Sequence, residues 1–245
     1  MKKTIAVIVV LATLGMLAPT VHAASFTIDH FTQPNTGQAL SITGTGTQSN
    51  TTTGLVGVVG GSRTMQISVA SSAFGLSSSL NVNPAGVGTL SLGNDSGQNG
   101  VGTITWDANG AGLGGVDITN GGLLPFIQAT ILASDLDLGF RVDITETAAA
   151  GGSTAFWSTN LGPGVSFVNQ ALASFTNAGV VDFTKVNKIV LTMSGPVAQD
   201  ATIDLMEVTN SPGGVPEPLT LLGVFAGMSG LGAYIRRRRA SATSV

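Results

Sequence analysis

The chain has 245 residues and a formal net charge of −3, with only 9% charged residues, 34 glycines and no cysteine. Soluble domains usually contain about 25% charged residues, so this surface is unusually poor in ions. The composition excludes a basic nucleic-acid-binding protein, because no positive field is present to neutralise phosphates. The lack of cysteine excludes a thiol protease, a cysteine-ligated zinc site and a disulfide scaffold.

The first segment, residues 1–23, has the pattern of a secretory signal peptide. Two lysines precede an apolar stretch from Ile5 to Leu17, and small residues occupy both recognition positions at Val21 and Ala23. The apolar stretch is shorter than the roughly 20 residues that a membrane-spanning helix needs. We therefore predict export, with cleavage between Ala23 and Ala24.

A threonine-rich segment follows early in the mature region. Its threonines are Thr43, Thr45, Thr47, Thr51, Thr52 and Thr53. A regular threonine spacing would present a flat array of hydroxyl groups of the kind that can bind ice. Here the spacing is lost after Thr47 and glycines interrupt the segment, so we expect a flexible polar loop.

Residues 24–210 lack long helical periodicity and alternate apolar with polar residues. From Leu138 to Glu146 the apolar side chains share one face and the polar ones share the other, which is typical of a half-buried strand. The same alternation marks residues 65–69, 127–131 and 189–193, and clusters of Gly, Asn, Asp and Pro separate the runs at 83–84, 93–97, 107–110 and 162–164. We expect an all-β domain, an antiparallel two-sheet sandwich of the jelly-roll type.

The mature region is more acidic than the whole chain. Residues 24–214 contain four basic and twelve acidic side chains, so 4 − 12 gives a net charge of −8. Such a surface favours solubility and cation binding over contact with anionic polymers.

Candidate catalytic groups are few. His30 is the only histidine left after signal cleavage, and no Gly-x-Ser-x-Gly elbow supplies a nucleophile, so we expect His30 to face solvent. Glycoside hydrolysis uses two carboxylates, for which Asp135 with Asp137 and Asp143 with Glu146 are neighbours in sequence. An acidic rim explains these residues equally well. We therefore expect a protein without catalytic residues, and keep a carbohydrate hydrolase of the cell envelope as the alternative.

The C-terminus has three parts in a fixed order. A linker over residues 211–218 ends in the sequence Val215, Pro216, Glu217, Pro218. Its prolines can continue neither a strand nor a helix. Residues 219–235 form an uncharged apolar run that is just long enough to be a transmembrane helix. The tail over residues 236–245 begins with Arg236, Arg237, Arg238 and Arg239. The positive-inside rule predicts that this basic tail lies in the cytoplasm.

This order resembles the PEP-CTERM sorting signal of exported bacterial proteins, a tail type that also carries an ice-binding label. The resemblance covers residues 215–239. It implies a Gram-negative bacterium that makes exopolysaccharide, and an exosortase that recognises the tail in the inner membrane and removes it. The protein would then reach the cell surface or the extracellular matrix. If the tail is retained, the product is instead a single-span membrane protein that faces the periplasm.

The mature region resembles a galactose-binding-like jelly roll. The resemblance lies in a first strand at residues 26–31 and in last strands at 156–159, 173–175, 181–186, 188–191 and 200–208. That fold often carries a structural calcium where its first and last strands pair. The resemblance therefore implies Asp29, Asp200 and Asp204 as candidate ligands of a structural calcium, which takes only oxygen ligands. No other cofactor is expected.

Sugar recognition usually needs an exposed aromatic ring beside polar groups. Trp106 continues the apolar face of Ile104 and is expected in the core. Trp157 follows Phe156 directly, so one of the two faces outward, and we expect that it is Trp157. The sequence thus predicts a secreted, non-enzymatic β-sandwich with a structural, adhesive or exopolysaccharide-associated role, in which Trp157 contacts carbohydrate.

Overall fold

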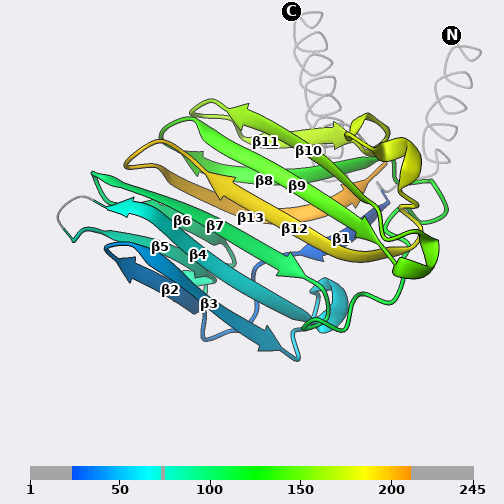
Figure 1. Cartoon of the computed structure of the whole chain (residues 1–245), viewed down its shortest axis with the longest axis horizontal. Helices are drawn as coiled ribbons and strands as arrows, with labels where there is room; N and C mark the ends of the chain where they lie inside the picture. Colours follow the sequence, from blue (N-terminus) through cyan, green and yellow to red (C-terminus); the bar gives the residue numbers. More distant parts are fainter. Residues whose placement is uncertain (1–23, 73–74, 211–245) are drawn as a thin grey trace, which may run out of the picture. The chain divides into compact units, whose positions relative to one another are not determined.

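The computed structural model describes residues 24–72 and 75–210 (Figure 1). The signal peptide, the linker with its Pro-Glu-Pro motif, the apolar run and the basic tail lie outside the described residues. Within the described part, no helix is both long enough and apolar enough to cross a membrane.

The described residues form strands joined by turns and short 3-10 helices. The strands are β1 Ser25–Asp29, β2 Gln38–Thr43, β3 Gly46–Thr53, β4 Ser62–Ser72, β5 Ser77–Val82, β6 Leu90–Asn94, β7 Gln98–Trp106, β8 Phe126–Ser134, β9 Leu138–Glu146, β10 Thr154–Leu161, β11 Phe167–Ala171, β12 Val186–Ser194 and β13 Asp200–Thr209. The 3-10 helices are η1 Val59–Gly61, η2 Pro84–Gly86, η3 Ala148–Ala150, η4 Leu172–Ser174 and η5 Ala178–Val180.

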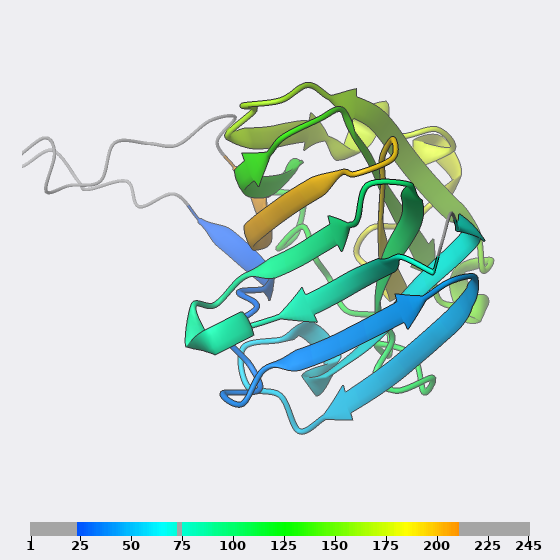
Figure 2. The same cartoon turned by 90° about the vertical axis from the view of Figure 1, so that its left-hand side faces the viewer.

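The strands make two antiparallel sheets that pack face to face (Figure 1). The seven-stranded sheet has the order β11-β8-β13-β6-β5-β2, with β1 paired to β13, and the six-stranded sheet has the order β10-β9-β12-β7-β4-β3. Figure 2 shows β2 and β3, in blue, at one side of the sandwich and the yellow-green strands β10 and β11 at the other. The predicted antiparallel jelly-roll-like sandwich is confirmed.

The core lies between the sheets because each strand directs alternate side chains inward. In β9 the buried positions are Leu138, Phe140, Val142 and Ile144, as the sequence alternation predicts. Trp106 at the end of β7 is fully buried, which confirms its expected place in the core.

The prediction that the threonine-rich segment is a flexible polar loop is wrong. It is not a flexible loop, because β3 pairs along its whole length with β4, from Gly46 opposite Val69 to Thr53 opposite Ser62. β-Branched threonines favour extended backbone, and the hydroxyls of Thr47 and Thr51 meet hydroxyls on β4. The oxygen of Thr51 lies 2.8 Å from that of Thr64.

Two of the expected last strands are also wrong. Residues 173–175 belong to η4 and the turn after it, and residues 181–185 form a connection that ends where β12 begins at Val186. The Asp182 carboxylate closes a turn in that connection by accepting hydrogen bonds from the hydroxyl and the backbone N–H of Thr184. Hydrogen bonds from the Thr184 hydroxyl and from Lys185 lower the pKa of Asp182 to about 2.

Candidate functional site

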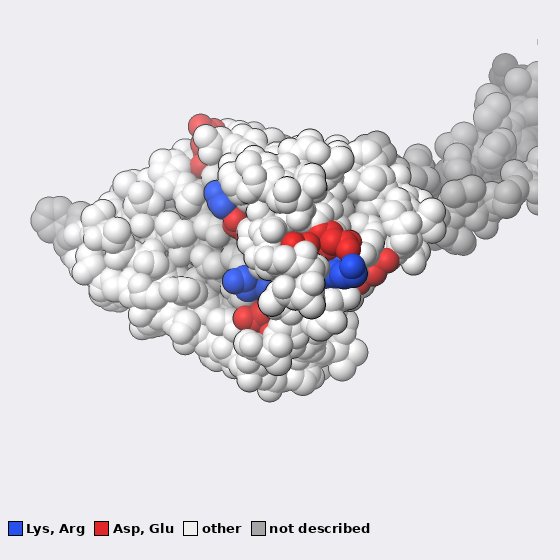
Figure 3. All heavy atoms as spheres, turned by 45° about the vertical axis from the view of Figure 1, so that its right-hand side comes forward, with Lys and Arg blue, Asp and Glu red and all other residues white. Residues whose placement is uncertain are grey.

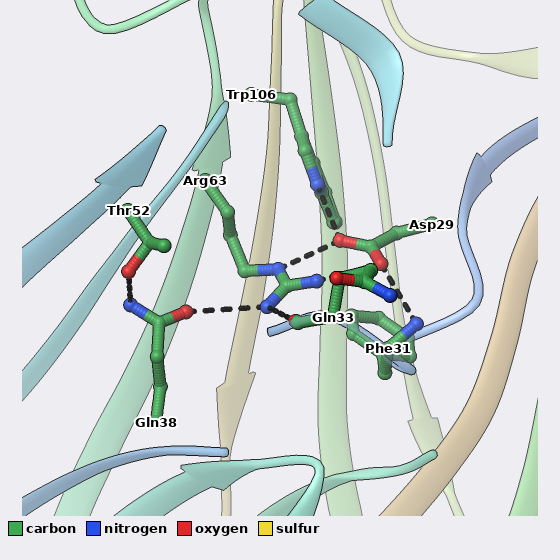
Figure 4. Close-up of polar contacts among 7 residues, drawn as sticks. All are labelled: Asp29, Phe31, Gln33, Gln38, Thr52, Arg63 and Trp106. Carbon is green, nitrogen blue, oxygen red and sulfur yellow. Dashed lines mark hydrogen bonds and ion pairs between the residues drawn. The ribbon is translucent and has the colours of Figure 1, made fainter. Parts of the chain in front are cut away.

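Asp29, a predicted calcium ligand, is fully buried in an ion pair with Arg63 of β4 (Figure 4). Arg63 Nε donates to Asp29 Oδ2 at 2.7 Å, and Arg63 Nη2 donates to Oδ1 at 2.8 Å. The indole of Trp106 donates to Oδ2 at 2.9 Å, and the backbone N–H of Phe31 donates to Oδ1 at 2.7 Å. Four donors therefore converge on this one carboxylate.

The remaining contacts of Arg63 tie several strands together. Its Nη1 donates to the backbone oxygen of Gln33 at 2.8 Å and to Gln38 Oε1 at 3.2 Å. The Gln38 amide in turn donates to the hydroxyl of Thr52 in β3. The guanidinium carbon lies 5.5 Å from the ring centre of Phe31. This network joins the end of β1 to β2, β3, β4 and β7.

The three candidate calcium ligands do not meet. Asp29 lies opposite Met206 in the β1–β13 pairing, whereas Asp200 begins β13 opposite Gly93 of β6. Asp204 projects from the partly exposed face of β13, while Asp29 is inside the sandwich. No group of three His, Cys, Asp or Glu side chains that could hold a metal ion occurs in the described ranges. These residues therefore do not fit a shared calcium site, and a cation at Asp29 would have to displace Arg63.

The expected orientation of Trp157 is wrong. Trp157 lies opposite the buried Val142 and packs against the core, with its ring centre 6.0 Å from that of Phe140 and 6.4 Å from that of Phe175. Phe156 lies opposite Asp143 and is therefore on the outer face of the six-stranded sheet. The outward aromatic ring of β10 is thus Phe156.

A shallow depression of about 360 Å³ lies on this outer face, where β9, β10 and β12 run side by side. It is lined by Gly139, Phe140, Arg141, Ser158, Thr159, Asn160, Thr192 and Ser194. A side chain at position 139 would displace the Ser194 hydroxyl, because an added Cβ would lie 2.5 Å from its oxygen. Glycine at this position keeps the floor of the depression low.

Arg141 is held between an acid and an aromatic ring beside the depression. Its Nε and Nη2 donate to the two oxygens of Asp143 at 2.8 and 2.5 Å, and its Cζ lies 4.1 Å from the ring centre of Phe156. The hydrogen bond to Asp143 raises the pKa of Arg141. The Arg141 side chain is still 43% exposed, so it can donate to a ligand. Paired charges and a bidentate contact fix the guanidinium plane.

The rest of the outer face is rich in hydroxyl and amide groups. In one row of facing residues the order across five strands is Gln66, Thr103, Thr192, Arg141, Ser158. Figure 3 shows that most of the surface in view is uncharged and that the charged side chains gather on one part of it. The face can thus offer many neutral donors and acceptors in a fixed array.

The candidate catalytic residues are not assembled. Glu146 is buried and accepts hydrogen bonds from the backbone N–H groups of Ser153 and Asp182, whereas Asp143 points to the outer face of the same strand. Asp135 and Asp137 lie in the exposed turn between β8 and β9. His30 is exposed just after β1, as expected.

No family model matches the chain, and a search of curated proteins finds no match. Several solved structures are similar to it at low identity. The family 11 carbohydrate-binding module from Clostridium thermocellum, in complex with a mixed-linked tetrasaccharide, shares 13% identity over 76% of this chain and 96% of its own, with a TM-score of 0.40. An engineered variant of the Cel12A cellulase of Rhodothermus marinus shares 12% identity over 70% of this chain and 100% of its own, with a TM-score of 0.38.

Proposed function

We propose that this protein is a non-catalytic β-sandwich that contacts neutral polysaccharide through the depression on the outer face of β9, β10 and β12. The observation that carries the proposal is the arrangement of Arg141, held between Asp143 and Phe156, beside a wall of hydroxyl and amide groups. Sugars present adjacent hydroxyls and an apolar ring face, which planar polar groups and aromatic rings recognise together.

Charge favours a neutral glycan. The Arg141 and Asp143 charges cancel at the depression, and the −8 charge of residues 24–214 repels anionic polymers. The depression is open and shallow, so it can take an internal stretch of a chain rather than only its end. Such contact suits a structural or adhesive role in an extracellular polysaccharide matrix.

The proposal predicts that Phe156→Ala and Asn160→Ala each weaken binding to a neutral polysaccharide about tenfold, because each removes part of the contact surface. Affinity electrophoresis in gels containing mixed-linkage β-glucan, glucomannan or galactan measures the change, after a glycan array has identified the best of these probes.

The matched control is Thr130→Ala, which alters the outer face of the other sheet and should leave binding unchanged. Equal affinity for all three variants would place binding elsewhere. Release of reducing ends from the bound polysaccharide would instead support the hydrolase alternative.

We also propose that the ends of the chain act as sorting signals, on the sequence resemblance of residues 215–239 to a PEP-CTERM tail. An exosortase in the inner membrane would be the partner, and the surface or the extracellular matrix the destination. Intact-mass spectrometry of the native protein is expected to find, in the culture supernatant, a species that begins at Ala24 and ends near Pro218. Full-length tails confined to the inner membrane would contradict this and support a periplasm-facing anchored protein.

A further inference from the structure

Strand β3 is an open edge of the six-stranded sheet. It is the last strand in the order and pairs with β4 without a bulge from Gly46 to Thr53. No backbone hydrogen bond joins β3 to any described segment other than β4. Because alternate residues of an antiparallel edge strand point their N–H and C=O groups away from the sheet, this edge is a template for another strand.

The other edges of the sandwich are blunted. At β10 the backbones of Phe156 and Thr176 exchange hydrogen bonds of 3.1 and 2.8 Å, so a neighbouring segment covers part of that edge. In the seven-stranded sheet, the edge strands β11 and β2 have 5 and 6 residues, whereas β3 has 8. The long uncovered edge is therefore a specific feature of β3.

Neither β3 nor its neighbour β4 carries an exposed charge that would oppose self-association. From Phe31 to Asn94 the only charged residue is Arg63, which is fully buried against Asp29. Proteins usually protect an exposed edge strand with lysine, proline or a bulge, and β3 has none of these. The twelve acidic residues that give residues 24–214 their charge of −8 all come before Phe31 or after Asn94 in the sequence.

We propose that two copies of this chain pair antiparallel through β3 and join their six-stranded sheets edge to edge. An antiparallel pair about a two-fold axis is self-complementary, so the same strand serves both partners. With Ser49 opposite Ser49 of the second copy, Thr47 of each copy would lie opposite Thr51 of the other. The Thr47 and Thr51 hydroxyls already pair in this cross-strand manner with hydroxyls on β4.

The pairing has a geometric consequence. The two-fold axis that relates antiparallel strands is perpendicular to the sheet at the join, so the outer faces of both copies lie on the same side of the joined sheet. The depressions at β9, β10 and β12 would then lie at the two far ends of one surface, where a long polymer could reach both. This consequence rests on the proposed function, whereas the pairing itself does not.

Cross-linking of the full chain tests the pairing, because the sequence has no cysteine and a single new thiol reports one position. Ser49→Cys, in the middle of β3, is expected to give a dimer with a short bismaleimide. Ser158→Cys is the control, since it is exposed on the opposite edge strand β10 and should remain monomeric.

A charge placed on the edge separates strand pairing from chance contact. In the Ser49→Cys chain, adding Thr51→Lys is expected to lower the cross-linked fraction roughly fivefold, because a lysine on an edge strand opposes its pairing with another strand. Adding Thr103→Lys, on the same outer face but at the centre of the sheet, should leave it unchanged. Circular dichroism checks that each variant is folded, and Thr53→Lys replaces Thr51→Lys if that chain is not. No dimer at Ser49→Cys, equal dimer at Ser158→Cys, or a dimer insensitive to the edge lysine would overturn the proposal.

Discussion

Arg63→Met is expected to lower the free energy of unfolding by about 3–5 kcal/mol, because it leaves the Asp29 carboxylate buried without its counter-charge. The two side chains are both 0% exposed, so water cannot replace the lost partner. Trp106 and the Phe31 N–H still donate to Asp29, but neither carries a charge. Urea unfolding followed by tryptophan fluorescence measures the loss.

The control for this variant is Arg141→Met at the exposed ion pair with Asp143. That change is expected to alter the free energy of unfolding by no more than about 1 kcal/mol, because exposed pairs contribute little. If the two variants lose the same free energy, removal of an arginine side chain in general, and not the buried charge, is responsible. The comparison therefore isolates burial as the cause.

The ion pair also shows what local sequence patterns cannot give. Asp29 and Arg63 lie 34 residues apart, and Trp106 lies 77 residues from Asp29. Their meeting depends on the order of strands in two sheets, which no short window of sequence records. The resemblance to a calcium-bearing fold therefore implied a calcium ion at Asp29, whereas the positive charge beside this carboxylate is that of Arg63.

Strands with a clear two-residue alternation were predictable. The segment from Leu138 to Glu146 is β9 with the expected buried face, because a strand with one apolar and one polar face has only one stable orientation on a core. β3 has no apolar face, so no alternation of apolar and polar residues marks it as a strand. Only pairing with β4 makes it a strand.

The orientation of β10 could have been read from its sequence. Ala155, Trp157 and Leu161 share one face, while Phe156, Ser158 and Asn160 share the other. The adjacent rings of Phe156 and Trp157 do not by themselves decide the orientation, since either could be the exposed one. The more apolar set faces the core. The candidate ring for carbohydrate contact is therefore Phe156, which lies against Arg141, and not Trp157.

Gly100→Ala is expected to lower the free energy of unfolding by about 1–3 kcal/mol, the usual cost of overpacking a core. Gly100 faces inward from β7, and a Cβ there would lie 2.5 Å from Asn94 Oδ1 and 2.7 Å from Ser78 Oγ. Asn94 and Ser78 belong to the other sheet, so the two sheets approach closely at this end. Asn94 also accepts a hydrogen bond from the Gly100 N–H at 3.0 Å, which the added methyl would disturb.

Gly179→Ala is the matched control for thermal and urea unfolding of this variant. Position 179 is exposed and has open space around an added Cβ, so the substitution should change the free energy of unfolding by no more than about 0.5 kcal/mol. Gly102→Ala should fall between the two, because its nearest obstacle is the Leu80 Cδ1 atom at 2.9 Å, the movable end of a side chain. A stable Gly100→Ala variant would mean that β6 and β7 can separate at this end without loss, and that the Asn94 contact does not hold the sheets together.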